Sequence, residues 1–363
     1  MNHPVVRVAI VIALFGCSSG IASAQVFGPW SDPQPVTAIN TASAEGCPIE
    51  STDGLGLYFA SNRAGGQGKL DNWRALRASV NSPWGSAENL GAAANSSEFD
   101  YCPTALAGNT LLFVSSRQTT DDCFPGDVPP VPPTGGPSAG DIFLTHEDSP
   151  LAWSNPVNLG CYPNGPNTAG AEFSPSMVTT PGGKFLFFSS NGYPDSQGQD
   201  IYMSQVQTDG TVLAGVRVAE LSTAADDRMP NVRADGLEIV FSSNRAGGSA
   251  FDQDIYVATR PDTNSPWSAP QRIDNLAIDT TASETRSSLS ADGKRLYFGR
   301  KLDINDPGDV FVSTRERLAS SSATSLPGPG AVMLALLATL LSGGAWFASR
   351  PRSNAAVQTR KES

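Results

Sequence analysis

Charged residues and histidine are scarce in this 363-residue chain. Asp, Glu, Lys and Arg make up 16% of it, and its two histidines are His3 and His146. A coiled coil or long helical rod needs many charged helix formers and few breakers, so 35 glycines and 28 prolines exclude both. So few histidines disfavour catalytic triads and zinc sites built from two or three histidines. The breakers separate aromatic and β-branched runs, which is typical of many short strands.

The two ends of the chain are composed like export and anchoring segments. Residues 1–24 contain Arg7, an apolar run and an Ala-Ser-Ala cleavage motif, which predict a signal peptide, and a lipoprotein motif at Cys17 is the alternative. A Ser/Pro/Gly linker at 318–330 precedes an apolar run at 331–348. As a helix, that run is just long enough to cross a bilayer. Basic residues in the tail, 349–363, predict that it stays on the inner side.

The exported body is acidic. The whole chain has a net charge of −11, and several of its basic residues lie in the two terminal segments. An acidic surface repels phosphate backbones, so we expect no nucleic-acid partner. Cations and basic partners remain compatible with this charge.

A strand-turn-strand unit recurs five times along the body. Each copy has a glycine in its turn, between alternating apolar runs, at positions 54, 108, 183, 236 and 293. An Asp-led strand follows each copy, beginning at Asp71, Asp141, Asp200, Asp254 and Asp309. Outer strands are expected at 84–90, 153–159, 212–218 and 267–273, and a fifth at 30–36 precedes the first unit. A Pro-rich insertion at 119–140 lengthens the second interval.

The repeats predict one all-β domain, a five-bladed β-propeller over residues 26–317. The displaced N-terminal strand would complete the last blade and close the ring, which leaves no exposed sheet edge. The Ser-Asn-Arg-Ala-Gly-Gly run at 61–66, its counterpart at 242–248 and the Asp-Ile-Tyr triplets resemble WD40-like PD40 repeats of TolB-type propellers. That resemblance implies the propeller fold and a range of roles, from binding modules to appendages of enzymes. The C-terminal segments resemble PEP-CTERM-type sorting signals, and a plain membrane anchor is the alternative.

An acid recurs near the start of every inner strand. These candidate ligand-binding residues are Glu45, Asp100, Glu172, Asp227 and Glu284. Inner strands line the channel of a propeller, so the acids could ring its mouth and bind a cation, a basic group or a sugar. The alternative is a structural network with facing arginines and the Asp of the third strand, made of Arg63, Arg117, Arg245, Arg300, Asp71, Asp141, Asp200, Asp254 and Asp309. Glu172 faces Asn191 instead of arginine, so it is the acid we expect to contact a ligand.

Two further sets of residues have candidate roles. Asp303, Asn305, Asp306 and Asp309 place oxygens in a Gly-containing loop, as Ca²⁺ binding requires, although Asp and Asn are also common turn residues. No other cofactor is expected. Four cysteines remain after the signal peptide, an even number in an oxidising compartment. Position in the repeats favours Cys123 with Cys161 and Cys47 with Cys102.

These features favour an exported, non-catalytic binding or protein-interaction scaffold in the bacterial cell envelope. It would be periplasmic or at the cell surface, held at the inner membrane by the C-terminal helix or released from it, with an envelope protein or glycan as partner. The face with the acids and the 119–140 insertion would bind that partner, unless the insertion is only a spacer. The alternative is a glycan-active hydrolase or lyase that uses channel-mouth carboxylates.

The predicted acid–arginine pairs can be tested in blade 1. Glu45→Gln and Arg63→Ala should each lower the melting temperature, because each leaves its partner buried and unpaired. Thermal melts of both single variants and the double variant should show coupling in a double-mutant cycle. Additive effects would argue against the pair.

Overall fold

The computed structural model describes residues 26–124, 130–131, 136–137, 139–247 and 252–318. The predicted signal peptide, the 331–348 helix and the 349–363 tail lie outside these residues. Within them, every regular element is a strand, and none is a helix long and apolar enough to cross a membrane.

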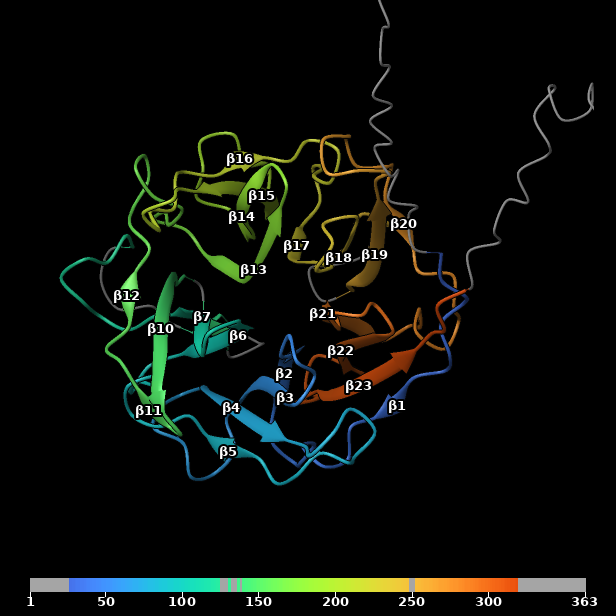
Figure 1. Ribbon diagram of the computed structural model, residues 1–363, viewed down its shortest axis with the longest axis horizontal. Coiled ribbons are helices and arrows are strands. Elements are labelled where there is room, and N and C mark those ends of the chain that lie inside the picture. The colour runs from blue at the N-terminus through green and yellow to red at the C-terminus, as the bar shows by residue number, and fades with distance from the viewer. Residues whose placement is uncertain (1–25, 125–129, 132–135, 138, 248–251, 319–363) are drawn as a thin grey trace, which may run out of the picture. The chain divides into compact units, whose positions relative to one another are not determined.

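Five sheets stand around a central axis, so the predicted five-bladed propeller is confirmed (Figure 1). Blade 1 contains β2 (Glu45–Glu50), β3 (Gly56–Ser61), β4 (Asp71–Leu76) and β5 (Glu88–Asn89). Blade 2 contains β6 (Asp100–Leu106), β7 (Thr110–Ser115), β10 (Asp141–Ser149), β11 (Ala152–Trp153) and β12 (Val157–Asn158). Blade 3 contains β13 (Glu172–Thr180), β14 (Gly183–Ser190), β15 (Asp200–Val206) and β16 (Val216–Arg217).

Blade 4 contains β17 (Asp227–Val232), β18 (Glu238–Ser243), β19 (Asp254–Thr259) and β20 (Gln271–Arg272). Blade 5 contains β21 (Ser283–Leu289), β22 (Arg295–Lys301), β23 (Asp309–Thr314) and β1 (Gln34–Pro35). In the insertion, β8 (Pro130–Val131) pairs with β9 (Gly136–Pro137).

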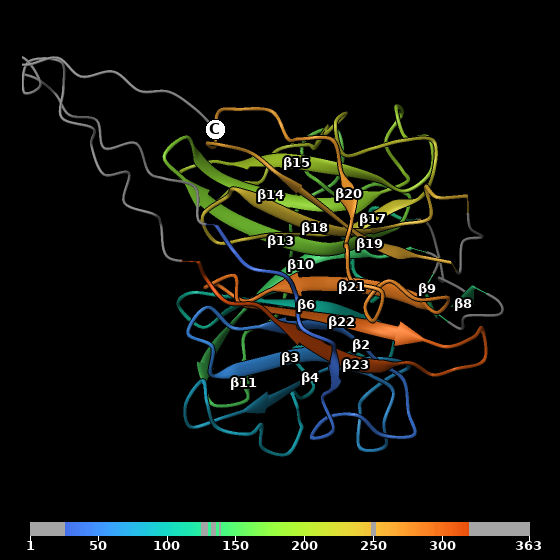
Figure 2. The same ribbon diagram turned by 90° about the vertical axis from the view of Figure 1, so that its right-hand side faces the viewer.

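The N-terminal strand closes the ring as the repeats predict (Figures 1 and 2). β1 pairs antiparallel with β23, with Gln34 opposite Val312. Ile39, just after β1, is fully buried in a cluster that includes Leu57 of blade 1 and Val310 of blade 5. The closure therefore joins the first and last blades by packing as well as by backbone hydrogen bonds.

The outer strands are shorter than the sequence predicted. Each of the five is paired over only two residues. In blades 2, 4 and 5 a proline lies within or beside the pair, at Pro35, Pro156 and Pro270. Proline has no N–H to donate to a ladder, which limits how far such a strand can extend.

Each inner strand contains a bulge at the same position. The register between first and second strands shifts in all five blades, two residues after the recurring acid. The residue at the bulge has a positive φ in every case: Cys47, Cys102, Ser174, Met229 and Arg286. A bulge redirects side chains, and these five residues, or their immediate neighbours, face the channel.

The closure predicts a large effect for Ile39→Ala. Removing a fully buried side chain from between two blades should cost about 2–4 kcal/mol of unfolding free energy. Urea unfolding measures this loss. Val26→Ala is the control, because Val26 is 57% exposed and its truncation should change stability by less than about 0.5 kcal/mol. Equal effects of the two changes would contradict the closure by packing.

Candidate functional site at the junction of blades 2 and 3

The five recurring acids do not open into the channel. All five side chains are buried, with exposed fractions from 0% to 4%. In every blade a hydroxyl four residues earlier in the chain donates to the acid: Thr41, Ser96, Thr168, Thr223 and Thr280. The sequence analysis missed these residues, although their constant offset from the acid was a detectable signal.

Four of the acids are paired with the arginines that the sequence placed opposite them. Arg63 meets Glu45 at 2.8 Å, Arg117 meets Asp100 at 2.7 Å, Arg245 meets Asp227 at 2.6 Å and Arg300 meets Glu284 at 3.0 Å. Each arginine also donates to a backbone carbonyl of the segment before its inner strand. Their guanidinium groups lie over Phe59, Phe113, Phe241 and Phe298 of the second strands. These pairs fasten the hairpins.

The aspartates that begin the third strands form a separate set. Four of them bind an outer-strand side chain instead of the predicted arginine: Asp71 with Asn89, Asp141 with Asn158, Asp200 with Arg217, and Asp254 with Arg272. The predicted three-member network is therefore two networks. At each junction the aspartate of one blade comes next to the inner-strand acid of the following blade, because the residue before the aspartate accepts a hydrogen bond from the backbone of that acid.

Blade 3 lacks the arginine. Gly192 follows Ser190-Asn191 where blades 1 and 4 have arginine after Ser-Asn. Thr168 and Ser190 donate to Oε1 of Glu172 at 2.6 Å and 2.7 Å. Its Oε2 is buried and has no hydrogen-bond partner in the described protein. Burial without a cation raises the pKa of Glu172 well above its ordinary value, which favours the protonated form of this carboxyl group.

Asp141 is the carboxylate across the junction from Glu172. The backbone N–H of Glu172 donates to the carbonyl of Gly140, the residue before Asp141, at 3.3 Å. Oδ2 of Asp141 accepts from the Cys123 N–H and the Asn158 amide, while Oδ1 is buried without a partner. Burial raises the pKa of Asp141 to about 6, despite those two hydrogen bonds. The Tyr101 hydroxyl is also buried without a hydrogen-bond partner. Its burial and the charges of Glu172 and Asp141 raise its pKa.

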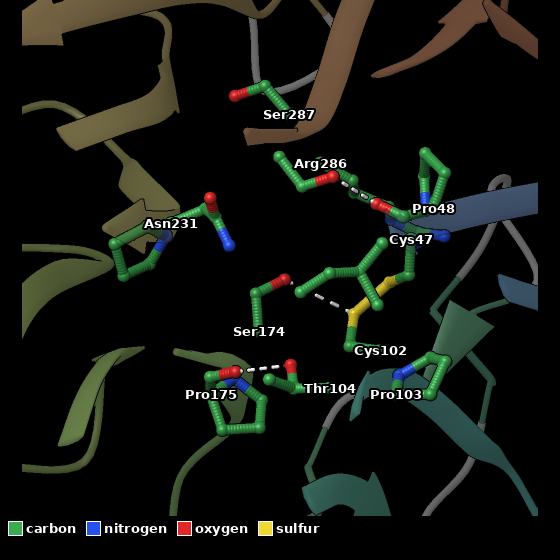
Figure 3. A pocket seen from close by; sticks show the side chains of 13 residues that line it. Cys47, Pro48, Cys102, Pro103, Thr104, Ser174, Pro175, Asn231, Arg286 and Ser287 are labelled. Atoms are coloured by element: carbon green, nitrogen blue, oxygen red, sulfur yellow. Dashed lines mark hydrogen bonds between the residues drawn. A yellow bond between two sulfur atoms is a disulfide. The ribbon is translucent and has the colours of Figure 1, made fainter. Parts of the chain in front are cut away.

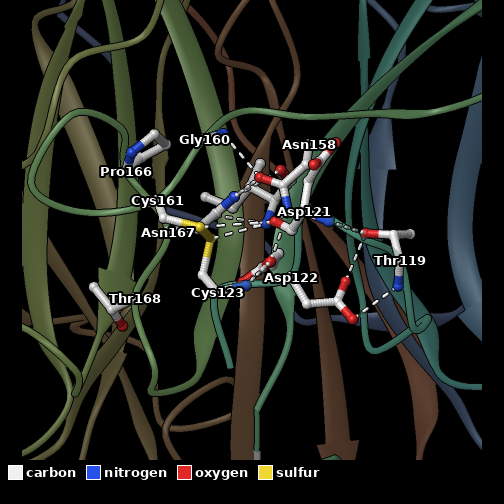
Figure 4. The surroundings of a disulfide bond; sticks show 12 residues. Thr119, Asp121, Asp122, Cys123, Asn158, Gly160, Cys161, Pro166, Asn167 and Thr168 are labelled. Atoms are coloured by element: carbon white, nitrogen blue, oxygen red, sulfur yellow. Dashed lines mark hydrogen bonds between the residues drawn. A yellow bond between two sulfur atoms is a disulfide. The ribbon is translucent and has the colours of Figure 1, made fainter. Parts of the chain in front are cut away.

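A short segment at 119–123 contacts Asp141 through the Cys123 N–H. Figure 4 shows Thr119, Asp121, Asp122 and Cys123 of this segment. A disulfide joins Cys123 to Cys161, which is one of the two pairs that the repeats favoured. The Asn158 amide donates both to the carbonyl of Asp121 and to Asp141. Asp122 accepts from the backbone and hydroxyl of Thr119, which closes the turn. The start of the insertion is thus fastened over the blade 2 edge of the junction.

The channel itself is closed by the bulge residues (Figure 3). A second disulfide joins Cys47 to Cys102, the other favoured pair, and links the inner strands of blades 1 and 2. The Ser174 hydroxyl points to Cys102 Sγ at 3.3 Å. The remaining cavity, bordered by all five inner strands, has about 20 Å³ of room for the centres of water-sized molecules. That volume holds a water or a small ion, not a sugar ring.

The predicted calcium loop is hydrogen-bonded to itself. Asp303 accepts from the N–H groups of Asn305 and Asp306, and Asp306 accepts from those of Leu302 and Gly308. Among the described residues, no three His, Cys, Asp or Glu side chains are placed to hold a metal ion. The side chains of Asp303 and Asp306 therefore stabilise the turns of their own loop, and Asp309 begins β23.

Comparison with known proteins finds the fold among solved glycoside hydrolases. A thermostable family-43 glycoside hydrolase matches 80% of this chain and 94% of its own, with 14% identity and a TM-score of 0.50. An α-L-arabinofuranosidase from Lactobacillus brevis matches 79% of this chain and 95% of its own, with 14% identity and a TM-score of 0.51. No family model and no curated protein matches. At this identity the likeness shows a shared fold.

The non-catalytic scaffold that the sequence favoured is contradicted, because the matched solved structures of this fold are glycoside hydrolases. The sequence argument against catalysis was that an acid recurring in every blade is structural. That argument holds where an arginine neutralises the acid. It does not hold at Glu172, where the arginine is replaced and the protonated carboxyl has a neighbouring aspartate.

The raised pKa of Asp141 predicts a pH-dependent cost of folding. An unfolded Asp ionises near 4, whereas folded Asp141 ionises at about 6, so stability falls as pH rises through this window. Asp141→Asn removes the cost, and its stability relative to wild type should rise by up to about 3 kcal/mol between pH 4 and 7.

Urea unfolding at several pH values measures that difference. The control is Asp254→Asn at the equivalent position of blade 4, where Arg272 pairs with the carboxylate. It should not gain stability relative to wild type as pH rises. A pH-independent difference for Asp141→Asn would contradict the raised pKa.

Proposed function

We propose that the protein is a glycan-active enzyme that hydrolyses glycosidic bonds with Glu172 and Asp141. The observation that supports this is a pair of carboxyl groups on adjacent blades, each with one unpartnered oxygen, and with unequal pKa shifts. Glycoside hydrolysis commonly uses one protonated and one ionised carboxyl group. When their environments separate the pKa values of two carboxyl groups, the one with the higher pKa acts as the acid and the ionised one as the base.

Glu172 is the general acid of this pair. Burial raises its pKa well above the ordinary value, which favours the protonated form that can give a proton to the oxygen of the departing sugar. Thr168 and Ser190 fix Oε1, which leaves Oε2 as the oxygen that faces substrate. The hydroxyls then stabilise the carboxylate that remains after proton transfer.

Asp141 is the second carboxyl group. With a pKa of about 6 it is mostly ionised at pH 7, as a base or nucleophile must be. The Cys123 N–H and Asn158 amide hold Oδ2, so Oδ1 is free to act on water or on the sugar. Substrate contact requires movement of the 119–123 segment that binds Oδ2.

The proposed substrate is a polysaccharide outside the cytoplasm. The signal peptide predicted at 1–24 and the two disulfides support export, and exported enzymes meet polymers that cannot enter the cell. One structural match is named as an α-L-arabinofuranosidase, so arabinan is the first substrate to test. The predicted C-terminal helix would hold the enzyme at the membrane if it is retained, and its cleavage would release the enzyme.

Hydrolysis of arabinan, xylan and other polysaccharides tests the proposal, with released sugars measured by mass spectrometry. Glu172→Gln and Asp141→Asn should each lower kcat about 10²–10⁴-fold, because each removes one member of the acid–base pair. Wild-type kcat should fall below about pH 6 as Asp141 becomes protonated. Asp254→Asn is the matched control and should keep wild-type activity.

Two results would overturn the proposal. One is the absence of turnover by the folded wild-type protein across the polysaccharide panel. The other is a Glu172→Gln variant as active as wild type. Circular dichroism and urea unfolding of each variant separate loss of chemistry from loss of fold.

A further inference from the structure

Arg286 is the charged member of the five bulge residues around the channel. Its counterparts are Cys47, Cys102, Ser174 and Met229, which carry no charge. Arg286 borders the central cavity together with Ser287 and Ser288, at the middle of β21. The channel therefore contains one guanidinium group at the level where the five inner strands come closest.

The Arg286 guanidinium has no partner among the described residues. Its backbone N–H donates to the Ser242 hydroxyl, but no side-chain hydrogen bond or ion pair is formed. The other charges that act on it are not compensating carboxylates. Arg228 lies close enough to lower the pKa of Arg286, and it is already paired with Asp226. By contrast, each of the four arginines that face the recurring acids forms an ion pair with its acid.

The Arg286 guanidinium lies against the backbone of Gly46. A Cβ on Gly46 would lie 2.5 Å from Arg286 Nη1, so the guanidinium can occupy this place only because residue 46 is glycine. The Ser287 hydroxyl borders the same cavity, is 3% exposed and is unpartnered. Two unused donors, one of them cationic, thus face a space of about 20 Å³. The Ser287 hydroxyl is buried without an acceptor, which is costly unless an acceptor fills that space, and the partly exposed Arg286 has no carboxylate partner beside it.

We propose that Arg286 and Ser287 form a binding site for one small monovalent anion in the central channel. The chemistry is that of a halide or a formate-sized carboxylate: a single negative charge that accepts hydrogen bonds and fits where a sugar does not. The ring acids do not oppose such an anion, because arginines or protonation neutralise them. The anion would complete the centre of the propeller and is separate from the Glu172–Asp141 pair.

Bromide locates the site directly. Crystals of the wild-type protein grown in sodium bromide should show an anomalous peak beside Arg286 and Ser287. Thermal melts at constant ionic strength, with bromide replacing gluconate, should show a rise of a few degrees for wild type. Formate should compete with bromide if the site accepts a carboxylate, and leave the bromide response unchanged if it accepts halide alone.

Variants test the residues. Arg286→Met and Ser287→Ala should lose or weaken the bromide response, while Arg317→Gln, which removes one exposed positive charge, should keep it. If Arg286→Met fails to fold, Arg286→Lys retains the charge, loses the fork of donors and should bind bromide more weakly. No bromide peak in wild-type crystals, or equal thermal responses of wild type and Arg286→Met, would overturn the proposal.

Discussion

A buried carboxyl group lies at or near the start of each inner strand of this propeller, and neighbouring groups of the same blade form hydrogen bonds with it. A hydroxyl four residues earlier binds the acid from its own chain segment. In four blades an arginine at the end of the second strand, or two residues after it, pairs with the acid, although Oε2 of Glu284 has no hydrogen-bond partner. The same arginine donates to the preceding segment and lies over an aromatic ring. Breaking such a buried ion pair would leave one charge buried without a partner. The pair therefore opposes any shift in the register of the hairpin. The bulge two residues later then occurs at the same height in all five blades, and the five strands meet around a closed channel.

The repeats were sufficient to predict the blade count, the closure by the N-terminal strand, the acid–arginine pairs and the two cysteine pairings. The acid–arginine pairs follow from offsets within a unit, whereas the closure and the Cys47–Cys102 pairing follow from equivalent positions in different units. The sequence did not predict the contacts that the third-strand aspartates make with the outer strand and with the next blade. Asp71 and its counterparts were placed with the arginines of their own blade, yet they bind the outer strand and lie beside the next blade's acid. The lengths of the outer strands were also overestimated, since the alternating pattern continued past prolines that end the ladder.

Blade 3 differs from its neighbours by a single loss, and that loss changes the chemistry at one junction. Where blade 1 has Arg63, blade 3 has Gly192, and a Cβ there would lie 1.9 Å from the Thr168 hydroxyl. The space of an arginine has been taken up by close packing of backbone around Glu172. Burial without the cation raises the pKa of Glu172, and burial also raises the pKa of Asp141 across the junction. Two interacting carboxyl groups with unequal affinity for protons are costly to keep in a fold, and such cost is typical of sites retained for function.

The charge of the channel is the reverse of what the composition suggests. The protein is acidic and its acids recur around the axis, so a negative channel mouth was the natural expectation. The structure turns those acids into the blades, where arginines, hydroxyls and protons satisfy them. The charged group left bordering the central cavity is Arg286, held in a space that Gly46 leaves open. The fold therefore pairs four of its ring carboxylates with its own arginines and leaves Arg286, whose backbone forms the bulge of β21, beside the central cavity without an acid.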